Sequence, residues 1–195
     1  ELGRAPFSGC TSVKEFSVAA GSTTFTTQDG VLFSADMSQL FCYPAAKAGS
    51  SYVIPAEVSV IKDMAMNGCR ALTDISVEEG SVLRIVEGTA LSTTPWLNNA
   101  TDDFVLLGTC LVEYKGSDSE VTIPDGVTSI THQAFFRSRD LTRLTMPDSV
   151  IHIGEGAFYA KSNLTWDAIT FSANLATIGD RTFSGCSGLS GVPFA

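Results

Sequence analysis

Two histidines are the residues of this chain best suited to acid–base chemistry. His132 and His152 are its whole histidine content, and an imidazole changes charge close to neutral pH. Each lies within two residues of an apolar repeat position, Ile130 or Ile153, and the chain has no Gly-x-Ser-x-Gly nucleophile motif. We therefore interpret both histidines as solvated side chains and predict no catalytic residue.

Carboxylates and thiols give equally little support for a reactive centre. The acidic pairs Glu78-Glu79 and Asp102-Asp103 consist of adjacent residues, which point to opposite faces of a strand and suit a general acid and base poorly. The segment Lys115–Asp118 has one acid, whereas a calcium loop needs several at alternate positions. No Cys-x-x-Cys or closely spaced Cys–His pair occurs. The sequence predicts no metal, no cofactor and no enzymatic activity.

The elements that must position any functional side chain belong to a repeat of about 23 residues. Its best copies start at Ile54-Pro55, Ile123-Pro124 and Met146-Pro147. Each continues with apolar residues at fixed positions and an Ala-Phe-like pair, such as Ala157-Phe158. One coil of this length cannot bury its own apolar face, but stacked coils bury each other's. The repeat therefore predicts a leucine-rich-repeat solenoid, rich in β-structure with irregular or short helical turns.

Weaker copies extend this pattern towards both ends of the chain. A truncated copy starts at Leu2 and includes Pro6-Phe7 and Cys10, and an out-of-register copy has Val82, Ile85 and Ala90-Leu91. The last copy follows a two-residue insertion at Trp166-Asp167, and its core positions are Phe171, Leu175, Ile178, Thr182-Phe183, Cys186, Leu189, Val192 and Phe194.

Three of the five cysteines share one position of this repeat. Cys10, Cys69 and Cys186 are equivalent to Ser138 and Lys161 in other copies. The odd count and wide spacing argue against a disulfide framework. We interpret the position as a small buried or edge site that requires no thiol chemistry.

Two segments interrupt the repeat, and each has the pattern of a β-hairpin. In the first, Val31–Phe33 and Leu40–Cys42 flank a polar turn; in the second, Phe104–Leu107 and Leu111–Tyr114 flank Gly108-Thr109-Cys110. We read both as insertions or substitute coils within a single solenoid, 1–195. Its parts are a truncated repeat at 1–20, a hairpin at 21–52, repeats at 53–92, a second hairpin at 93–120 and repeats at 121–195.

Composition limits the partners of this solenoid. Hydrophobic residues make up 44% of the chain and charged residues 17%, and the net charge is −9. The Lys and Arg residues are scattered, which argues against nucleic acid or an anionic membrane as a partner. No apolar run reaches the roughly 18 residues needed for a membrane span. A signal segment is absent here and is expected to have been removed upstream, together with further repeats.

Candidate binding residues come from two places in the pattern. Outward positions of the predicted strands give Glu15, Ser17, Asp74, Ser76, Arg143 and Thr145. Trp96 and Trp166 lie outside the repeat, in insertions. Each tryptophan either fills an apolar gap made by its insertion or is an exposed anchor for a partner or a sugar ring.

The repeat resembles that of the BspA-like (Treponema pallidum-type) leucine-rich repeat family. The resemblance rests on the phrases Val121–Ile130, Pro147–Phe158 and Thr182–Leu189, and it covers most of the chain. It implies a secreted or cell-surface protein, common in Bacteroidetes, that adheres to host or bacterial surface proteins or to glycans. The chain departs from the pattern at Met66, Ser138, Lys161 and Ser172. The alternative function is that of a structural spacer displaying another domain of a larger surface protein.

Overall fold

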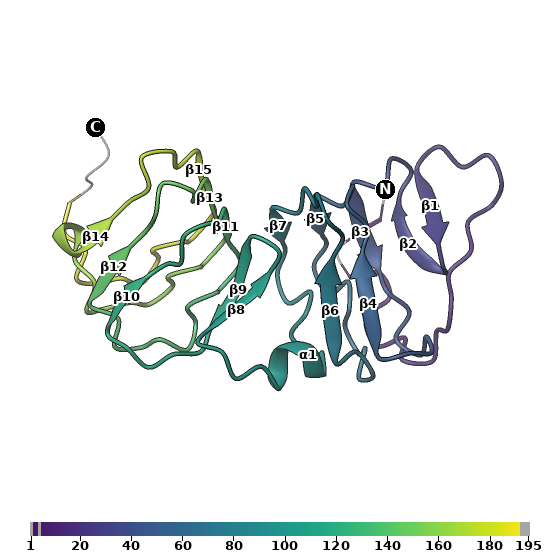
Figure 1. The fold of residues 1–195 in the computed structure, drawn as a ribbon, viewed down its shortest axis with the longest axis horizontal. Helices are drawn as coiled ribbons and strands as arrows, with labels where there is room; N and C mark the ends of the chain where they lie inside the picture. Colours follow the sequence, from purple (N-terminus) through teal and green to yellow (C-terminus); the bar gives the residue numbers. More distant parts are fainter. Residues whose placement is uncertain (1, 4, 192–195) are drawn as a thin grey trace. The chain divides into compact units, whose positions relative to one another are not determined.

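The computed structural model describes residues 2–3 and 5–191. The chain divides into two compact units, Glu1–Ala100 and Thr101–Ala195 (Figure 1). Each sheet is built from strands of one unit. Two expected core positions, Val192 and Phe194, lie outside the described residues. The single-solenoid arrangement concerns how the units join, and it stays a prediction.

The first unit consists of short strands in two sheets and one helical turn. Its larger sheet has the order β1 (Phe25–Gln28), β2 (Val31–Ser34), β3 (Gln39–Cys42), β5 (Val60–Ile61) and β7 (Ile85–Val86). Its smaller sheet pairs β4 (Ser51–Ile54) with β6 (Asp74–Val77). Helix α1 (Pro95–Asn98) begins where the Thr94 hydroxyl accepts a hydrogen bond from the Leu97 N–H.

The second unit has the same organisation. One sheet has the order β15 (Thr177–Ile178), β13 (His152–Ile153), β11 (Ser129–Ile130), β9 (Cys110–Tyr114) and β8 (Phe104–Leu107). The other has the order β10 (Glu120–Thr122), β12 (Arg143–Thr145) and β14 (Ile169–Thr170), and a 3-10 turn, η1 (Trp166–Ala168), precedes β14.

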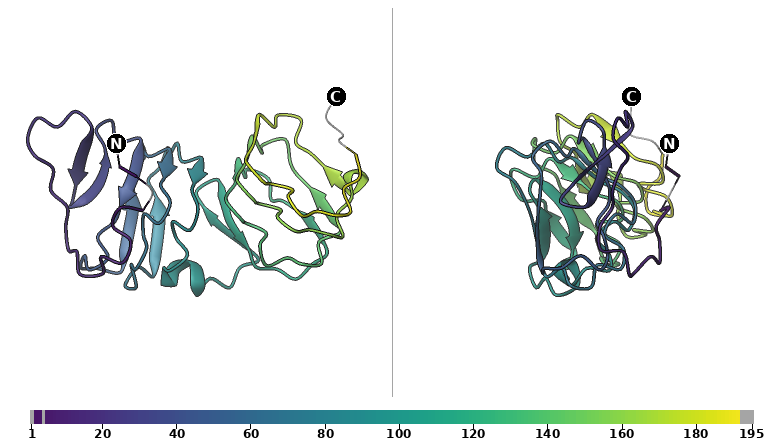
Figure 2. Two further views of the ribbon diagram at one scale, coloured as in Figure 1. Left: turned by 180° about the vertical axis from the view of Figure 1, so that it is seen from behind. Right: turned by 90° about the vertical axis from the view of Figure 1, so that its right-hand side faces the viewer.

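Successive coils of each unit stack in parallel register, as a solenoid requires. In the first unit Leu40 is paired with Ile61 and Ile61 with Val86. In the second, Ile130 is paired with Ile153, and both are fully buried. The left view of Figure 2 shows the coils running side by side within each unit. The predicted leucine-rich-repeat solenoid is confirmed.

A column of aromatic rings runs through the core of the second unit. Tyr114, Phe135, Phe158 and Phe183 follow one another in successive coils, with ring centroids 5.1, 4.9 and 5.5 Å apart. Phe104 extends the column, with its centroid 4.9 Å from that of Tyr114. Ring contacts at these spacings add to the free energy gained from burying each ring. The phenylalanine of the Ala-Phe pair therefore packs against the ring at the equivalent position of the neighbouring coil in the second unit.

Both predicted hairpins are present, and each covers one edge of a parallel sheet. In the first, β2 and β3 are antiparallel, with Leu32 opposite Cys42. In the second, β8 pairs antiparallel with β9, and Leu111 of β9 pairs in parallel with Ile130 of β11. The second hairpin thus contributes a coil through β9, whose Tyr114 joins the aromatic column. Strand β1 was not predicted, because its polar sequence, Phe-Thr-Thr-Gln, lacks an apolar alternation.

The weak copy near Ile85 is placed one residue too early in the sequence-based register. Its inward residues are Leu83 and Val86, which are 3% and 5% exposed, whereas the predicted Val82 is 55% exposed. The reason is a longer coil: Ile61 pairs with Val86 rather than with a residue about 23 positions on. Ala90 and Leu91 are buried as predicted.

The position shared by several cysteines makes a hydrogen bond to the preceding coil. Cys186 donates its S–H to the Phe158 carbonyl (3.1 Å), and Cys69 donates to the Tyr43 carbonyl (3.7 Å). Lys161 uses its amine in the same way towards the Phe136 carbonyl (3.4 Å). In these three coils the side chain is buried, which agrees with a packing role, whereas Cys10 at the same position is exposed and the buried Ser138 hydroxyl has no hydrogen-bond partner.

We predict that Phe135→Ala lowers the free energy of unfolding by about 3–5 kcal/mol, because it removes a fully buried ring from the middle of the column. The matched control is Phe136→Ala, which truncates the next residue along the chain. Phe136 is 59% exposed, so its loss should change stability by less than about 0.5 kcal/mol. Urea denaturation followed by circular dichroism measures the free energy of unfolding of both variants. Equal decreases in the two variants would contradict the packing role of the aromatic column.

Candidate binding surface

The strand-face candidates of the first unit lie on a small outward surface. In β6, Asp74 and Ser76 are exposed, while Ile75 between them is buried. Strand β4 places Ser51 beside Asp74 and Val53 beside Ser76. Glu15 and Ser17 are also exposed, in a coil without strand structure. The face is made of short side chains, and its binding role stays a prediction.

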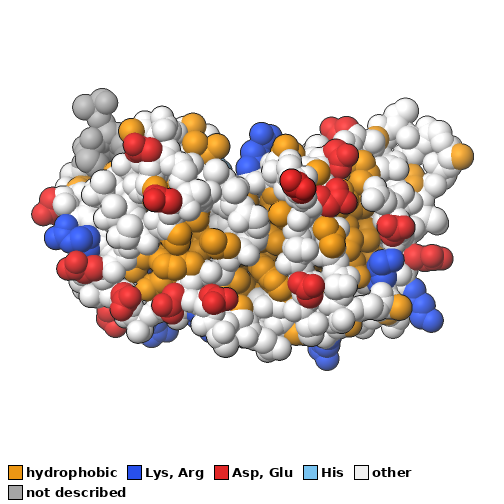
Figure 3. All heavy atoms as spheres, viewed as in Figure 1, with side chains coloured by type: hydrophobic (Ala, Val, Ile, Leu, Met, Phe, Trp, Pro, Cys, Tyr) orange, Lys and Arg blue, Asp and Glu red, His pale blue; other side chains and the backbone are white. Residues whose placement is uncertain are grey.

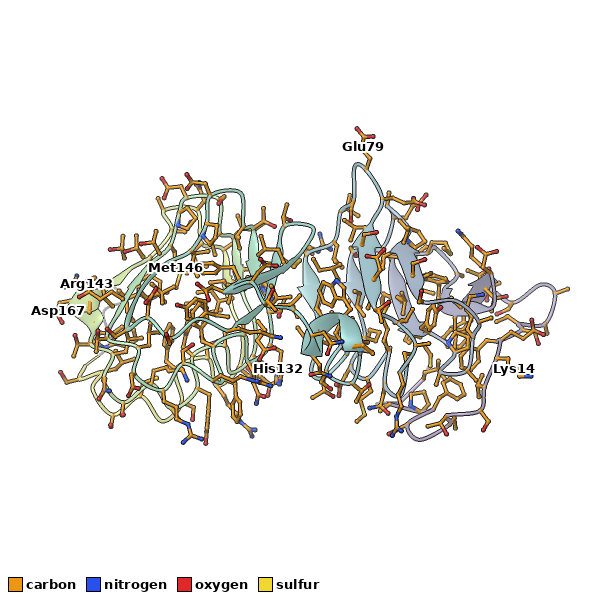
Figure 4. The ribbon with its side chains drawn as sticks, turned by 60° about the horizontal axis from the view of Figure 1, so that its bottom comes forward. Lys14, Glu79, His132, Arg143, Met146 and Asp167 are labelled. Atoms are coloured by element: carbon orange, nitrogen blue, oxygen red, sulfur yellow. The ribbon has the colours of Figure 1, made fainter. Side chains whose placement is uncertain are left out.

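In the second unit, the equivalent face carries Arg143 and Thr145 of β12. Arg143 is paired across the ladder with Glu120 of β10, and its Nε lies 3.7 Å from a Glu120 carboxylate oxygen. Both of these side chains are exposed, so the ion pair contributes little to stability. Figure 4 shows Arg143 at the periphery of this unit, on the opposite side from His132.

The two tryptophans are half-buried. Trp166 packs with its ring centroid 5.6 Å from that of Phe183, and its Nε1 donates a hydrogen bond to the Gly191 carbonyl (2.8 Å). These contacts favour the gap-filling alternative for Trp166. Trp96 lies in α1, and its backbone N–H donates to the Leu72 carbonyl (2.9 Å), which fixes the helical turn against the preceding coil.

Each histidine contacts the coil that follows its own. His132 Nδ1 lies 3.8 Å from a Glu155 carboxylate oxygen, and His152 Nδ1 shares a hydrogen bond with the Thr177 hydroxyl. Figure 3 shows acidic side chains scattered over the drawn face of each unit and few basic ones. Among the described residues, no group of three or more His, Cys, Asp and Glu side chains is placed to hold a metal ion.

The most prominent exposed feature is a pair of aromatic side chains in the second unit. Phe136 and Tyr159 are 59% and 44% exposed. They occupy the same repeat position, directly after Ala134-Phe135 and Ala157-Phe158. Their coils are joined by a hydrogen bond from the Phe135 N–H to the Ala157 carbonyl (3.1 Å). We call this pair, with the turns that carry it, the aromatic pair surface.

The fold does not require aromatic residues at this position. The equivalent residues are Ser8, Asn67, Ser92 and Ser184 in other copies of the repeat. Neighbouring exposed apolar side chains mark interaction sites when they form a large continuous patch, whereas single ones are common on protein surfaces. Core packing of the coils therefore does not require these two aromatic side chains.

Tight turns hold the aromatic pair surface in place. Phe136 donates its N–H to the Gln133 carbonyl (2.8 Å), and Tyr159 donates to the Gly156 carbonyl (3.0 Å). Gln133 and Gly156 have φ angles of 51° and 60°, in the left-handed region that sharpens the turn. A Cβ on Gly156 would lie in van der Waals contact with both neighbours, 3.5 Å from Gln133 Cγ and 3.9 Å from Tyr159 Cβ.

Basic side chains lie close to the pair. Arg137 extends from the same turn as Phe136, and its Nε lies 2.8 Å from a Glu113 carboxylate oxygen. Lys161 is 2% exposed, and its amine donates a hydrogen bond to the Phe136 carbonyl from the following coil. Burial of the Lys161 amine lowers its pKa from the usual 10.5.

Phe136 and Tyr159 are not among the residues predicted from the sequence to bind, because the repeat pattern leads one to expect aromatic residues beside a core phenylalanine to be buried. A signal was nevertheless present: the run Ala134-Phe135-Phe136 places two large aromatics next to each other. Phe158-Tyr159 is a second such run, whereas in the copies with Phe7-Ser8, Met66-Asn67 and Phe183-Ser184 only the first of the two positions is apolar. Comparison of the copies position by position would have identified Phe136 and Tyr159 as exceptions.

The repeat of the second unit matches a known family. Residues 112–195 match the profile described as "BspA type Leucine rich repeat region (6 copies)". This segment is a BspA-type leucine-rich repeat region. The resemblance predicted from the phrases around Ile123, Met146 and Thr182 is thereby confirmed, and the chain is a leucine-rich repeat protein of the BspA type over that range.

Several solved structures of bacterial proteins are similar to this chain, each with a TM-score below 0.5. The pneumococcal vaccine antigen PcpA is 23% identical and aligns with 89% of this chain and 37% of its own, at a TM-score of 0.46. A leucine-rich repeat protein from Eubacterium ventriosum is 14% identical, with coverages of 99% and 57% and a TM-score of 0.47. The T. pallidum leucine-rich repeat protein is 19% identical, with coverages of 90% and 80% and a TM-score of 0.33. The chain thus spans well under two thirds of the first two proteins.

No curated protein sequence matches the chain. Within the described residues, no helix has the length and apolar character needed to cross a bilayer.

We predict that Lys161→Met raises the free energy of unfolding at pH 7 by about 1–2 kcal/mol, because it replaces a buried amine with an apolar chain of similar length. Folding lowers the pKa of Lys161 from 10.5, so the unfolded chain binds more protons between the lowered pKa and 10.5. The stability of the unchanged protein should therefore rise with pH in that window.

The difference in free energy of unfolding between Lys161→Met and the unchanged protein should therefore become smaller as the pH approaches 10.5. Urea titrations at pH 7 and at successive alkaline pH values measure this difference. Lys14→Met, at an exposed lysine, serves as the control and should leave stability nearly unchanged. A Lys161→Met variant less stable than the unchanged protein at every pH would refute the interpretation.

Proposed function

We propose that this BspA-type leucine-rich repeat chain is a non-enzymatic binding module, and that the aromatic pair surface of the second unit contacts a protein partner. The observation that carries the proposal is the exposure of Phe136 and Tyr159 at a position that is polar in other coils. Tyrosine and arginine are enriched among the residues that dominate binding energy, and Arg137 lies beside the pair.

The surrounding geometry supports a prepared contact surface. Gln133 and Gly156 have left-handed backbone conformations, and the tight turns that they form position the backbone of Phe136 and Tyr159. The Lys161 amine donates a hydrogen bond to the Phe136 carbonyl. A rigid backbone reduces the entropy lost when side chains are immobilised in a complex. By contrast, the strand faces with Asp74 and Arg143 offer short or solvated side chains.

We further propose that the protein is secreted or displayed on a bacterial cell surface, where it binds host or bacterial surface proteins. The BspA-type repeat supports this placement, since the resemblance implies such a setting. In the alternative spacer role, the coils hold another domain away from the cell surface, and replacement of the aromatic pair would not change binding.

We predict that Phe136→Ala and Tyr159→Ala each weaken binding about 10- to 30-fold, as removal of a central aromatic contact does in protein interfaces. A binding screen of the chain against displayed host and bacterial surface proteins supplies the partner, and biolayer interferometry measures the affinities. Circular dichroism should show that both variants remain folded, because both side chains are exposed.

The matched controls are Asp74→Ala and Arg143→Ala on the two strand faces, together with Ser184→Ala at the equivalent position of the next coil. These should bind like the unchanged protein. If the strand-face variants lose binding and the aromatic variants do not, the site lies on the strand faces. Failure of all five variants to alter binding would exclude both surfaces.

A further inference from the structure

Basic side chains of the second unit are concentrated on the turns of the aromatic pair surface and on the equivalent turn of the next coil. Residues 101–195 contain six lysines and arginines, and four of them belong to these turns: Arg137, Arg139, Lys161 and Arg181. The whole chain has a net charge of −9. The cations of an acidic chain are therefore grouped beside its most exposed aromatic side chains.

Most of these cations have no acidic partner within the protein. Arg137 is the exception, because its Nε lies 2.8 Å from a carboxylate oxygen of Glu113. In the part of the chain that the structure describes, no carboxylate oxygen lies within 4.0 Å of the side-chain nitrogens of the other three. Asp140 and Asp180 are exposed neighbours in the sequence, and they too lie beyond this distance. Three positive charges are thus left without a counter-ion.

Lys161 places one of these charges inside the unit. The residue is 2% exposed, and its amine donates a hydrogen bond to the Phe136 carbonyl (3.4 Å). Other copies of the repeat carry Cys69, Ser138 or Cys186 at this position, so packing does not require a cation there. A buried charge without an opposite charge is costly for a protein. A carboxylate brought to this surface by a partner would offset part of that cost.

Two exposed arginines lie on the turns to either side of the pair. Arg139 follows Phe136 in the same turn, and its N–H donates to the Arg137 carbonyl (3.0 Å). Arg181 belongs to the coil after that of Tyr159, and a backbone hydrogen bond of 3.0 Å joins these two coils. A guanidinium group donates two parallel hydrogen bonds to a carboxylate. The surface therefore combines an apolar centre with carboxylate-binding groups around it.

We propose that the protein partner of the aromatic pair surface presents an acidic segment, an inference that rests on the binding role proposed above. An apolar side chain of the segment packs against Phe136 and Tyr159, and flanking carboxylates accept hydrogen bonds from Arg139 and Arg181. The observation that selects an acidic occupant is the group of cations without counter-ions. Complementary charge of this kind favours the correct partner and disfavours segments of the same shape but other charge.

The probes for this proposal are three synthetic peptides of equal length. All have the same centre rich in leucine and phenylalanine, with glutamate, glutamine or lysine at every flanking position. Fluorescence anisotropy measures their binding to the whole protein at low salt. We expect the glutamate peptide to bind about tenfold more tightly than the glutamine peptide. The net charge of −9 would by itself favour the lysine peptide, so this order reports the local surface.

Salt and three variants test the assignment of the cations. The preference for glutamate should disappear in about 1 M NaCl, where the screening length falls to roughly 3 Å. Arg139→Gln, Arg181→Gln and Lys161→Met should each weaken binding of the glutamate peptide about 3- to 10-fold and leave the glutamine peptide unaffected. Arg143→Gln, at an exposed arginine of the strand face, is the matched control and should change neither affinity.

Phe136→Ala separates this inference from the binding role on which it rests. This variant should weaken the glutamate and glutamine peptides by the same factor. If the three peptides bind equally and Phe136→Ala weakens all of them, the aromatic pair binds but the acidic partner is excluded. If Phe136→Ala changes no affinity, the binding role fails and this inference fails with it. Absence of glutamate-peptide binding at millimolar concentration, or an equal effect of Arg143→Gln and Arg139→Gln, would also overturn the proposal.

Discussion

Contact between successive coils is the constraint on which this structure depends. A coil of this repeat has no core of its own, and the aromatic column shows how neighbours supply it. Phe135 is fully buried because Tyr114 and Phe158 lie on either side. Parallel pairing such as that of Ile130 with Ile153 fixes the register in which these rings meet. Packing and backbone hydrogen bonding thus demand the same spacing along the chain.

This constraint explains why so much of the fold could be predicted. Inward positions repeat because each coil must match the one beside it, and Ile54, Ile123 and Met146 reveal the period directly. The register failed where a coil is longer: the sequence around Val82 offers apolar residues at two neighbouring positions, and only pairing with Ile61 selects Val86. Strand β1 escaped prediction because its threonines have no apolar alternation, and its pairing with β2 is decided by the turn at Asp29-Gly30.

The candidate site was much less predictable than the fold. Position in the repeat shows which residues point inward, but it does not show which outward residues bind. The alternation of the repeat predicts that Arg143 and Asp74 lie on outward strand faces, and the structure places them there. The exposure of Phe136 and Tyr159 is not predictable from the pattern, because an aromatic residue beside a core position has the sequence character of a buried one. Their exposure follows from the turn geometry at Gln133 and Gly156, which sequence alone does not reveal.

The two antiparallel hairpins have a consequence for the behaviour of the protein at high concentration. A parallel ladder of short strands ends in unpaired N–H and C=O groups, and such an edge recruits strands of other molecules. Strands β1 and β2 cover one end of the ladder of the first unit, and β8 covers one end of that of the second. Where the ladder instead ends on β7 or β15, the strand has two residues and offers few bonds to an incoming chain. At the hairpin ends the outer strands β1 and β8 have four residues each, so every end of these two ladders offers only a few backbone hydrogen bonds to a strand of another molecule.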